Sequence, residues 1–139
     1  MNFTNTLKNI KITINNIETN KINLLIKKIL KTNQNNKKVI IAETSYPFTL
    51  GFNDWTNNIL GTTNQIISSY EATPFGQKSY LLALKEKIKG TQQGFGFCYW
   101  GTEWVSFRGN QSTNGSPWEN QSLWDFNNRA LPAMAAFAE

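Results

Sequence analysis

The most constraining feature of this 139-residue sequence is an apolar run that ends in a carboxylate. Val39-Ile40-Ile41-Ala42 is followed at once by Glu43 and then by Thr44-Ser45-Tyr46-Pro47-Phe48. A continuous apolar run, in place of alternating apolar and polar residues, is typical of a parallel strand covered on both faces. We therefore predict a buried strand over 39–42 with Glu43 at its carboxyl end, where parallel α/β folds place their active sites.

The segments around this strand predict a repeated order of helices and strands. Thr73-Pro74 has the pattern of an N-cap followed by proline in the first helical turn, and Gly90 suits the stop of that helix. The other expected elements are a helix over 20–31, a second strand over 94–100 and a short final helix over 131–137. Isoleucines at 10, 12 and 14 alternate as in a strand, although a frayed helix fits them almost as well. Long polar segments, 44–72 and 106–117, follow the two strands, and loops of such length are commonly functional.

Residue usage excludes several kinds of chemistry. The sequence has no histidine and a single cysteine, Cys98, so an internal disulfide and a nucleophile–histidine pair are excluded, and the composition argues against a zinc site. Acid–base or covalent catalysis must then use carboxylates, with lysine or tyrosine as remote options. Because Cys98 lies in an apolar strand, we expect it to be a buried, inert thiol.

The net charge of +5 is unevenly distributed. Residues 1–42 carry eight lysines and one glutamate, whereas residues 43–139 carry six basic and eight acidic residues. The lysines are scattered and are not interleaved with aromatic residues, so we expect no binding of nucleic acid. No apolar run reaches the roughly 20 residues of a membrane span, and no signal-peptide core is present, so we expect no membrane association and leave the localisation open.

Four motifs carry a resemblance to a known family. They are Glu43-Thr44-Ser45-Tyr46-Pro47, Ala72-Thr73-Pro74-Phe75-Gly76-Gln77, Gly96-Phe97-Cys98-Tyr99-Trp100 and Trp118-Glu119-Asn120-Gln121-Ser122-Leu123-Trp124-Asp125-Phe126, followed by Ala130-Leu131-Pro132. The sequence from about Lys38 onward resembles the C-terminal part of glycoside hydrolase family 53, the arabinogalactan endo-β-1,4-galactanases. Family members are retaining (β/α)8-barrel enzymes with catalytic glutamates on strands four and seven. Residues 1–37, which include the expected helix over 20–31, match poorly.

This resemblance implies an α/β fold that is the C-terminal part of a TIM barrel. Residues 38–43 would be strand seven and residues 95–100 strand eight, with Glu43 as the catalytic nucleophile. A whole barrel needs about 250 residues, so at most two clear strands of the eight are expected here. The acid/base glutamate of strand four would lie outside the chain, and the isolated chain is expected to be inactive. Its partners would be galactan and either the missing N-terminal barrel half or a second copy of the chain.

The aromatic residues near the strand ends are candidates for sugar binding, because an aromatic plane packs on the C–H face of a pyranose. We predict this role for Trp100, Trp104 and Trp55, although Trp104 could equally be buried and Trp55 could fold inward. Trp118 and Trp124 are expected to pack the end of the barrel.

The polar residues of the closing motif allow two interpretations. We expect Glu119, Asn120 and Asp125 to satisfy turns rather than to act on substrate. The family resemblance also places Trp-Glu-Pro after strand eight, whereas this chain has Trp100-Gly101-Thr102-Glu103-Trp104, so that a role of the first glutamate is lost or moved to Glu103.

We expect no cofactor and no metal. Some bacterial family members hold calcium in the loop after strand seven, but here residues 49–72 offer only Asp54 and Glu71 as carboxylates. The resemblance implies that full-length relatives are secreted. An alternative function is a non-catalytic, galactan-binding or partner-dependent remnant of the barrel.

Overall fold

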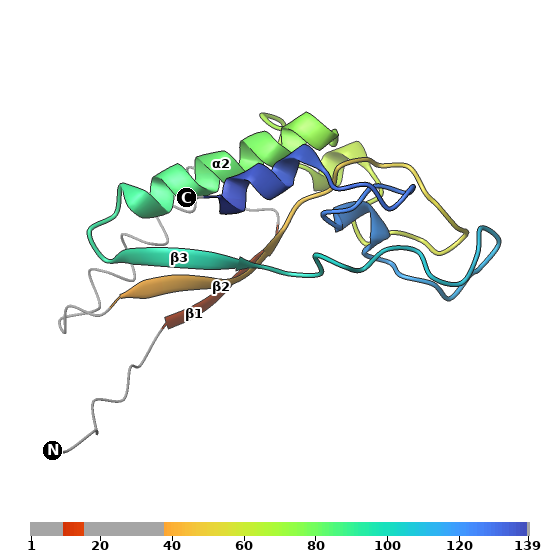
Figure 1. Cartoon of the computed structure of the whole chain (residues 1–139), viewed down its shortest axis with the longest axis horizontal. Helices are drawn as coiled ribbons and strands as arrows, with labels where there is room; N and C mark the ends of the chain where they lie inside the picture. Colours follow the sequence, from red (N-terminus) through yellow and green to blue (C-terminus); the bar gives the residue numbers. More distant parts are fainter. Residues whose placement is uncertain (1–9, 16–37, 139) are drawn as a thin grey trace, which may run out of the picture.

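A computed structural model describes residues 10–15 and 38–138 (Figure 1). The strands are β1 (Ile10–Asn15), β2 (Val39–Ser45) and β3 (Gly94–Tyr99), and the one α-helix among the described residues is α2 (Pro74–Lys89). Short 3-10 helices span Thr63–Gln65, Glu119–Gln121 and Pro132–Phe137. The strands predicted over 39–42 and 94–100 and the helix behind Thr73-Pro74 are confirmed. The helix predicted over 20–31 lies outside the described residues.

The three strands form one parallel sheet in the order β1-β2-β3. The expectation of at most two clear strands is therefore wrong by one. The alternating isoleucines at the N-terminus form β1, in which Ile10 pairs with Val39 and Ile12 with Ile41. The period of two was the correct signal, but six residues are too few to separate a strand from a frayed helix by periodicity alone.

Helix α2 begins and ends where its sequence predicts. The Thr73 hydroxyl accepts a hydrogen bond from the Gly76 amide at 3.0 Å, Pro74 occupies the first turn, and the Gly90 amide donates to the Glu86 carbonyl. Lys87 and Lys89 lie in the last turn, where cations interact favourably with the helix dipole. The buried face of α2 consists of Gln77, Tyr80, Leu81, Leu84 and Ile88.

One face of the sheet is covered by α2 and by the 3-10 helix Pro132–Phe137 (Figure 1). Tyr46 and Tyr80 stack at the centre of this layer, with ring centroids 4.4 Å apart. The surrounding core consists of Ile67, Leu81, Leu123, Ala133 and Ala136. On β3, Phe97 and Tyr99 pack against this core and contact Phe137.

Cys98 is exposed, which contradicts the expectation of a buried thiol. Successive side chains of a strand point to opposite faces. Because Phe97 and Tyr99 face the helical layer, Cys98 faces the opposite side of the sheet. The apolar neighbours that suggested burial lie on the other face of the strand.

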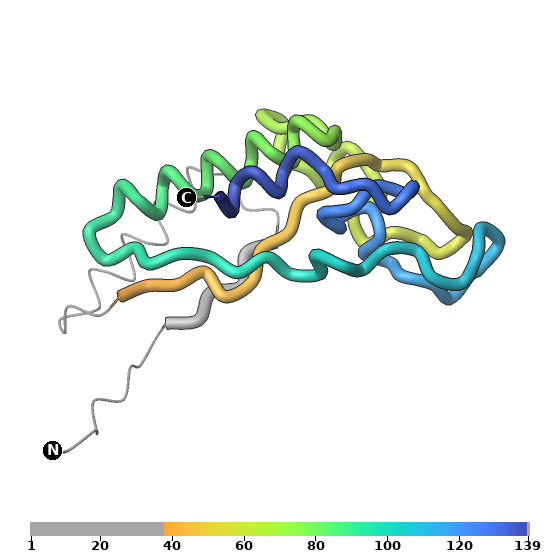
Figure 2. Tube along the Cα trace, viewed as in Figure 1, coloured from red at the N-terminus to blue at the C-terminus, as the bar shows by residue number. Residues whose placement is uncertain are grey.

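The long loops after β2 and β3 run side by side beyond the carboxyl ends of the strands (Figure 2). Backbone hydrogen bonds tie the two loops together, from Trp55 to Ser112 and from Ile59 to Pro117, each at 2.9 Å. Residues distant in sequence thus form one compact loop cluster, defined here as residues 46–72 and 100–126.

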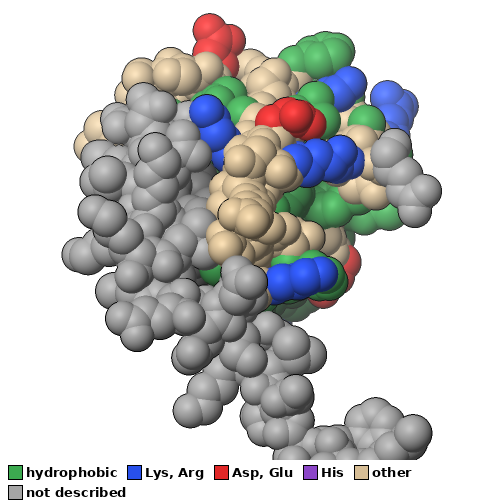
Figure 3. All heavy atoms as spheres, turned by 90° about the vertical axis from the view of Figure 1, so that its left-hand side faces the viewer, with side chains coloured by type: hydrophobic (Ala, Val, Ile, Leu, Met, Phe, Trp, Pro, Cys, Tyr) green, Lys and Arg blue, Asp and Glu red, His purple; other side chains and the backbone are tan. Residues whose placement is uncertain are grey.

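The opposite end of the molecule carries mixed charge. Seen from the end where α2 finishes and β3 begins, basic side chains are separated by acidic and uncharged groups over the described part of that face (Figure 3). Among the described residues, no helix is long and apolar enough to cross a membrane.

Candidate active site

Glu43 is brought to the site by a β-bulge in β2. Along β1, Ile12 pairs with Ile41 and Thr13 pairs with Glu43, so Ala42 has no pairing partner in β1. Along β3, Ile41 pairs with Phe97 and Thr44 with Tyr99, which leaves Ala42 and Glu43 opposite one residue. A bulge re-aims the side chains that follow it, and bulges are frequent beside active sites. The carboxylate is partly buried at the carboxyl end of the sheet.

The bulge separates two chemical environments. Ile41 and Thr44 are both buried, and the Thr44 hydroxyl is hydrogen-bonded to the Tyr80 hydroxyl of α2 at 3.0 Å. Ile41 and Thr44 therefore face the helical layer although three positions apart, which simple alternation forbids. The two residues between them, Ala42 and Glu43, therefore lie on the other face of the sheet.

The chain after Glu43 is held by fully buried polar side chains. The Ser45 hydroxyl donates to Gln121 Oε1 at 2.7 Å. The Tyr46 hydroxyl donates to the Tyr70 carbonyl at 2.7 Å and accepts from the Ile67 amide at 3.1 Å. Burial raises the pKa of Tyr46 to about 12, so this hydroxyl keeps its proton at neutral pH.

Tyr99 forms a second anchor at the end of β3. Its hydroxyl accepts from the Tyr46 amide at 3.0 Å and lies 2.7 Å from the Gln121 carbonyl, to which it donates. Gln77 Nε2 donates to the carbonyls of Tyr46 and Ser122, both at 2.9 Å. Burial raises the pKa of Tyr99 above its ordinary value. Sequence analysis missed this network, because single tyrosines and glutamines give no periodic or motif signal of their own.

Tryptophans line the loop cluster next to β3. The Trp100 amide donates to the Thr44 carbonyl at 2.8 Å, which fixes Trp100 directly beside the end of β2. The Trp100 and Trp104 rings meet edge to face at 5.5 Å, and Trp104 meets Trp118 in the same way at 5.7 Å. Gly101 has a φ of +74°, a conformation that favours glycine, and so it turns the chain between the first two rings.

A hollow of about 540 Å³ opens on this aromatic row. It is lined by Glu103, Trp104, Val105, Phe107, Gly115, Ser116, Pro117 and Trp118. Trp100 is 40% exposed, whereas Trp104 and Trp118 are half-buried. The structure thus brings together Trp100 and Trp104, both candidates for sugar binding, and adds Trp118, which the sequence suggested was purely structural.

Glu103 differs from Glu43 in its surroundings. It is exposed and lies in a turn, where its carboxylate accepts a hydrogen bond from the Thr102 hydroxyl at 2.6 Å. That bond lowers the pKa of Glu103, so the group stays ionised near neutral pH. A carboxylate of lowered pKa is poorly suited to donate a proton, and Glu103 therefore lacks the environment of a general acid.

Glu119 and Asn120 hold the loops. Glu119 is fully buried and accepts from the Asn53 amide at 2.7 Å. Its pKa is raised by burial and by the nearby charge of Asp54, against the opposing effect of the Asn53 bond. Asn120 Nδ2 donates to the carbonyls of Thr49 and Leu60. These contacts satisfy loop backbone, as expected.

Asp125 has the same kind of role. Its carboxylate caps a turn by accepting from the amides of Asn127 and Arg129, each at 2.8 Å. Trp124, which was expected to pack the end of the barrel, is 38% exposed and pairs with Ala130 in an isolated antiparallel bridge.

Trp55 lies apart from the other candidate tryptophans. Its side chain is 65% exposed, so it does not fold inward. It lines a hollow of about 330 Å³ formed by Phe52, Asn53, Asp54, Trp55, Asn57 and Asn110. No group of three or more acidic, cysteine or histidine side chains that could hold a metal occurs among the described residues.

The geometry defines the class to which this structure belongs. Parallel strands with helices on one face, loops gathered at the carboxyl ends and a glutamate at one such end form part of a (β/α) barrel, whose active sites occupy that end. The sequence profile of glycosyl hydrolase family 53 matches residues 13–137. The chain belongs to this family. The matched region begins upstream of Lys38 and includes the second half of β1.

Individual relatives agree with this assignment. The chain is 41% identical over 108 residues to the arabinogalactan endo-β-1,4-galactanase of Cellvibrio japonicus (strain Ueda107), covering 76% of this chain and 28% of that protein. The catalytic domain of family 53 from Ignisphaera aggregans superposes with a TM-score of 0.81 at 32% identity, over 94% of this chain and 38% of that one. A fungal β-1,4-galactanase, at 15% identity and a TM-score of 0.65, shares the fold over 93% of this chain and 37% of its own.

The chain therefore spans less than a third of the first of these relatives and less than two fifths of the two structures. The described residues supply three parallel strands, whereas a complete barrel of this architecture has eight.

Proposed function

We propose that this chain is the nucleophile-bearing, C-terminal part of a retaining endo-β-1,4-galactanase. In this proposal β2 and β3 are strands seven and eight of the barrel, and Glu43 is the nucleophile. The acid/base residue lies outside these 139 residues. The observation that carries the proposal is the position of Glu43. Because of the bulge at Ala42, Glu43 lies on the face of the sheet opposite to the buried side chains of Ile41 and Thr44.

The chemistry follows from a carboxylate at this position. In a retaining reaction the nucleophile attacks the anomeric carbon, the glycosidic C–O bond breaks, and a glycosyl ester forms with the carboxylate oxygen. A second carboxyl group, about 5–5.5 Å away, protonates the leaving oxygen and then activates water to cleave the ester. Glu119 is committed to the Asn53 amide, and Glu103 is exposed and ionised, so neither provides that acid.

The substrate would approach across the aromatic side chains. Trp100 lies beside the end of β2, and Trp104 continues the row, so both offer apolar surfaces for the C–H faces of galactose units. Trp55 offers a further exposed ring on the same loop cluster. The anchors at Ser45, Tyr46 and Tyr99 keep the backbone beside Glu43 fixed, as a preorganised site requires.

The first test uses a reagent that does not need the missing acid. A 2,4-dinitrophenyl 2-deoxy-2-fluoro-β-galactoside has a leaving group that departs without protonation, so a nucleophile alone can form the glycosyl ester. We expect slow labelling of the purified chain at Glu43, located by peptide mass mapping. Glu43→Gln is expected to abolish the label, whereas Glu103→Gln, which removes an exposed carboxylate, leaves it unchanged. Labelling at another carboxylate contradicts the assignment.

The second test addresses the acid/base residue. The purified chain is expected to release no reducing sugar from β-1,4-galactan. Mixing it with a separately produced N-terminal part of the Cellvibrio relative, up to the residue that precedes the matched region, is expected to produce activity that Glu43→Gln removes. Hydrolysis by the 139-residue chain alone would show that a second catalytic carboxylate lies within it.

A further inference from the structure

Two large aromatic side chains stand exposed at the outer part of the loop cluster. Phe52 is 56% exposed and Trp55 65% exposed, and both line the hollow of about 330 Å³. Exposed aromatic surface that gathers in one place is commonly a binding site. The family motifs do not include this segment, and the sequence suggested only Trp55 from it.

The backbone beneath these rings is firmly held. The Asn53 amide donates to the buried Glu119 carboxylate at 2.7 Å, and the Trp55 amide to the Ser112 carbonyl at 2.9 Å. The Asp54 side chain, 3% exposed, accepts from the Thr56 amide at 2.7 Å. The exposure of the rings is therefore not the result of a loosely packed loop, because the residues between them are anchored to buried groups.

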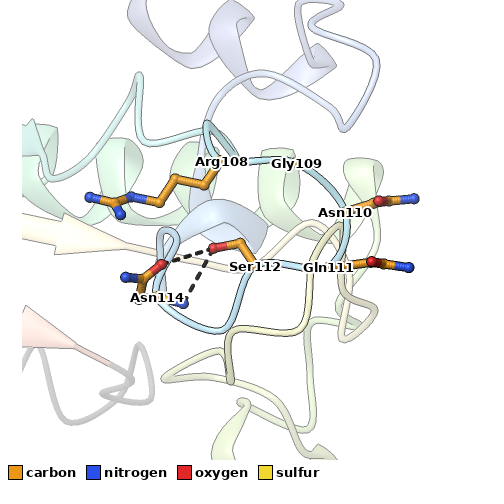
Figure 4. A pocket seen from close by; sticks show the side chains of 6 residues that line it. All are labelled: Arg108, Gly109, Asn110, Gln111, Ser112 and Asn114. Carbon is orange, nitrogen blue, oxygen red and sulfur yellow. Dashed lines mark hydrogen bonds between the residues drawn. The ribbon is translucent and has the colours of Figure 1, made fainter.

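Amide side chains flank the rings. Asn57 and Asn110 line the same hollow, and Asn110 is contributed by the other loop. Around the adjoining hollow, Asn110 and Gln111 extend to one side, whereas Arg108 points the opposite way and the Ser112 hydroxyl is hydrogen-bonded to Asn114 (Figure 4). The side chains next to Phe52 and Trp55 thus present both donors and acceptors without a basic group among them.

This combination fits an uncharged sugar. An aromatic ring packs on the C–H face of a hexose, while side-chain amides donate to and accept from its hydroxyl groups. The hollow has no lining residue in common with the one formed by Trp104 and Trp118. The loop cluster therefore carries two separate aromatic surfaces.

We propose that Phe52, Trp55, Asn57 and Asn110 form a second hexose-binding site, separate from the Trp100–Trp104 surface, that holds another stretch of the same polysaccharide chain. The choice of β-1,4-galactan as its ligand rests on the proposed function. Two sites on one polymer raise the affinity for long chains far more than that for short ones, because the second contact becomes intramolecular.

The site is tested by binding of β-1,4-galactotetraose to the purified 139-residue chain, measured by isothermal titration calorimetry, with β-1,4-galactan polymer in affinity gels as a second probe. We expect Trp55→Ala to weaken binding by about tenfold or more, the size of effect typical of a central aromatic contact. Trp55→Phe is expected to retain part of the affinity, and Asn110→Ala to weaken binding several-fold. The matched control is Phe75→Ala, which removes a 70%-exposed ring from α2.

Several outcomes would overturn this proposal. They are unchanged binding by Trp55→Ala, an equal loss in Phe75→Ala, and no binding by the wild-type chain when circular dichroism shows it folded. Cellotetraose, whose hexose units differ from those of galactotetraose only in the configuration at C4, where the glycosidic bond is attached, is the specificity control, and equal affinity for it rejects galactan as the ligand. Covalent labelling at Glu43 and binding of galactotetraose are separate readouts, so a failed nucleophile assignment and a failed second site give different results.

Discussion

The hydroxyl of Tyr99 is predicted to be one of the most important single atoms for the stability of the site. Tyr99→Phe removes only this oxygen and keeps the ring in its contact with Phe137. The hydroxyl accepts the Tyr46 amide and donates to the Gln121 carbonyl, and both partners belong to residues with at most 1% exposure. The substitution therefore leaves a buried donor and a buried acceptor unpaired.

The magnitude follows from these two groups. A buried polar group that loses its partner costs about 1–3 kcal/mol. The side-chain amide of Gln77 keeps its two carbonyl acceptors in the variant, so it adds little to the loss of stability. We expect Tyr99→Phe to lower the free energy of unfolding by about 2–6 kcal/mol, the sum over two orphaned groups.

The assay is urea denaturation at neutral pH followed by tryptophan fluorescence, because Trp100 lies directly after Tyr99. The matched control is Tyr70→Phe. The Tyr70 side chain is only partly buried, and its ring packs against the same core, 5.7 Å from that of Tyr80. We expect a change below about 0.5 kcal/mol there. If Tyr99→Phe were as stable as the control, the network would not hold the strand ends as argued.

Three further predictions concern the loops and the open face of the sheet. A Cβ at Gly115 would overlap the Asp54 carboxylate, so Gly115→Ala is expected to lower the thermal midpoint by several degrees, whereas Gly96→Ala, with open space around its added Cβ, is expected to change it little. The raised pKa of Glu119 means that the folded state holds its proton more tightly than the unfolded state, so this group's contribution to stability is full below pH 4.5 and falls as the pH rises through the raised value. Glu119→Gln should abolish that fall, which urea melts from pH 4 to 8 would reveal; an unchanged slope would contradict the raised pKa. Exposed Cys98 is expected to react with a disulfide reagent in native buffer as fast as in denaturant, and a marked native protection would show that its face is covered.

Much of the fold could be predicted because its signals are local. The apolar run that ends at Glu43, the Thr73-Pro74 cap and the glycine-aromatic strand each define an element within a few residues. The sequence did not decide whether β1 is a strand or a helix, because a segment of six residues is too short for its periodicity to distinguish the two. It also placed Cys98 in the interior, because an apolar neighbourhood does not reveal which of two faces a residue takes.

The site was only partly predictable. Glu43 and Trp100 follow from their places at strand ends, but the bulge depends on pairing with both neighbouring strands. The partners of Tyr99, Gln77 and Gln121 are 22 to 76 residues away in sequence, so no local pattern can report them. The sequence predicted Trp55 as a candidate but not the side chains around it, because Asn110 comes from a different loop.

The bulge at Ala42 makes the number of residues between Ile41 and Thr44, rather than their identity, the variable that decides how Glu43 is aimed. Replacing Ala42 by another small residue keeps the count, and with it the face that Glu43 occupies. Deleting Ala42 would remove the bulge and leave Ile41, Glu43 and Thr44 as successive residues in regular register with both neighbouring strands, so that Glu43 would lose the local kink that now aims its side chain. Natural variation at this point is therefore expected to tolerate substitution of Ala42 better than its deletion.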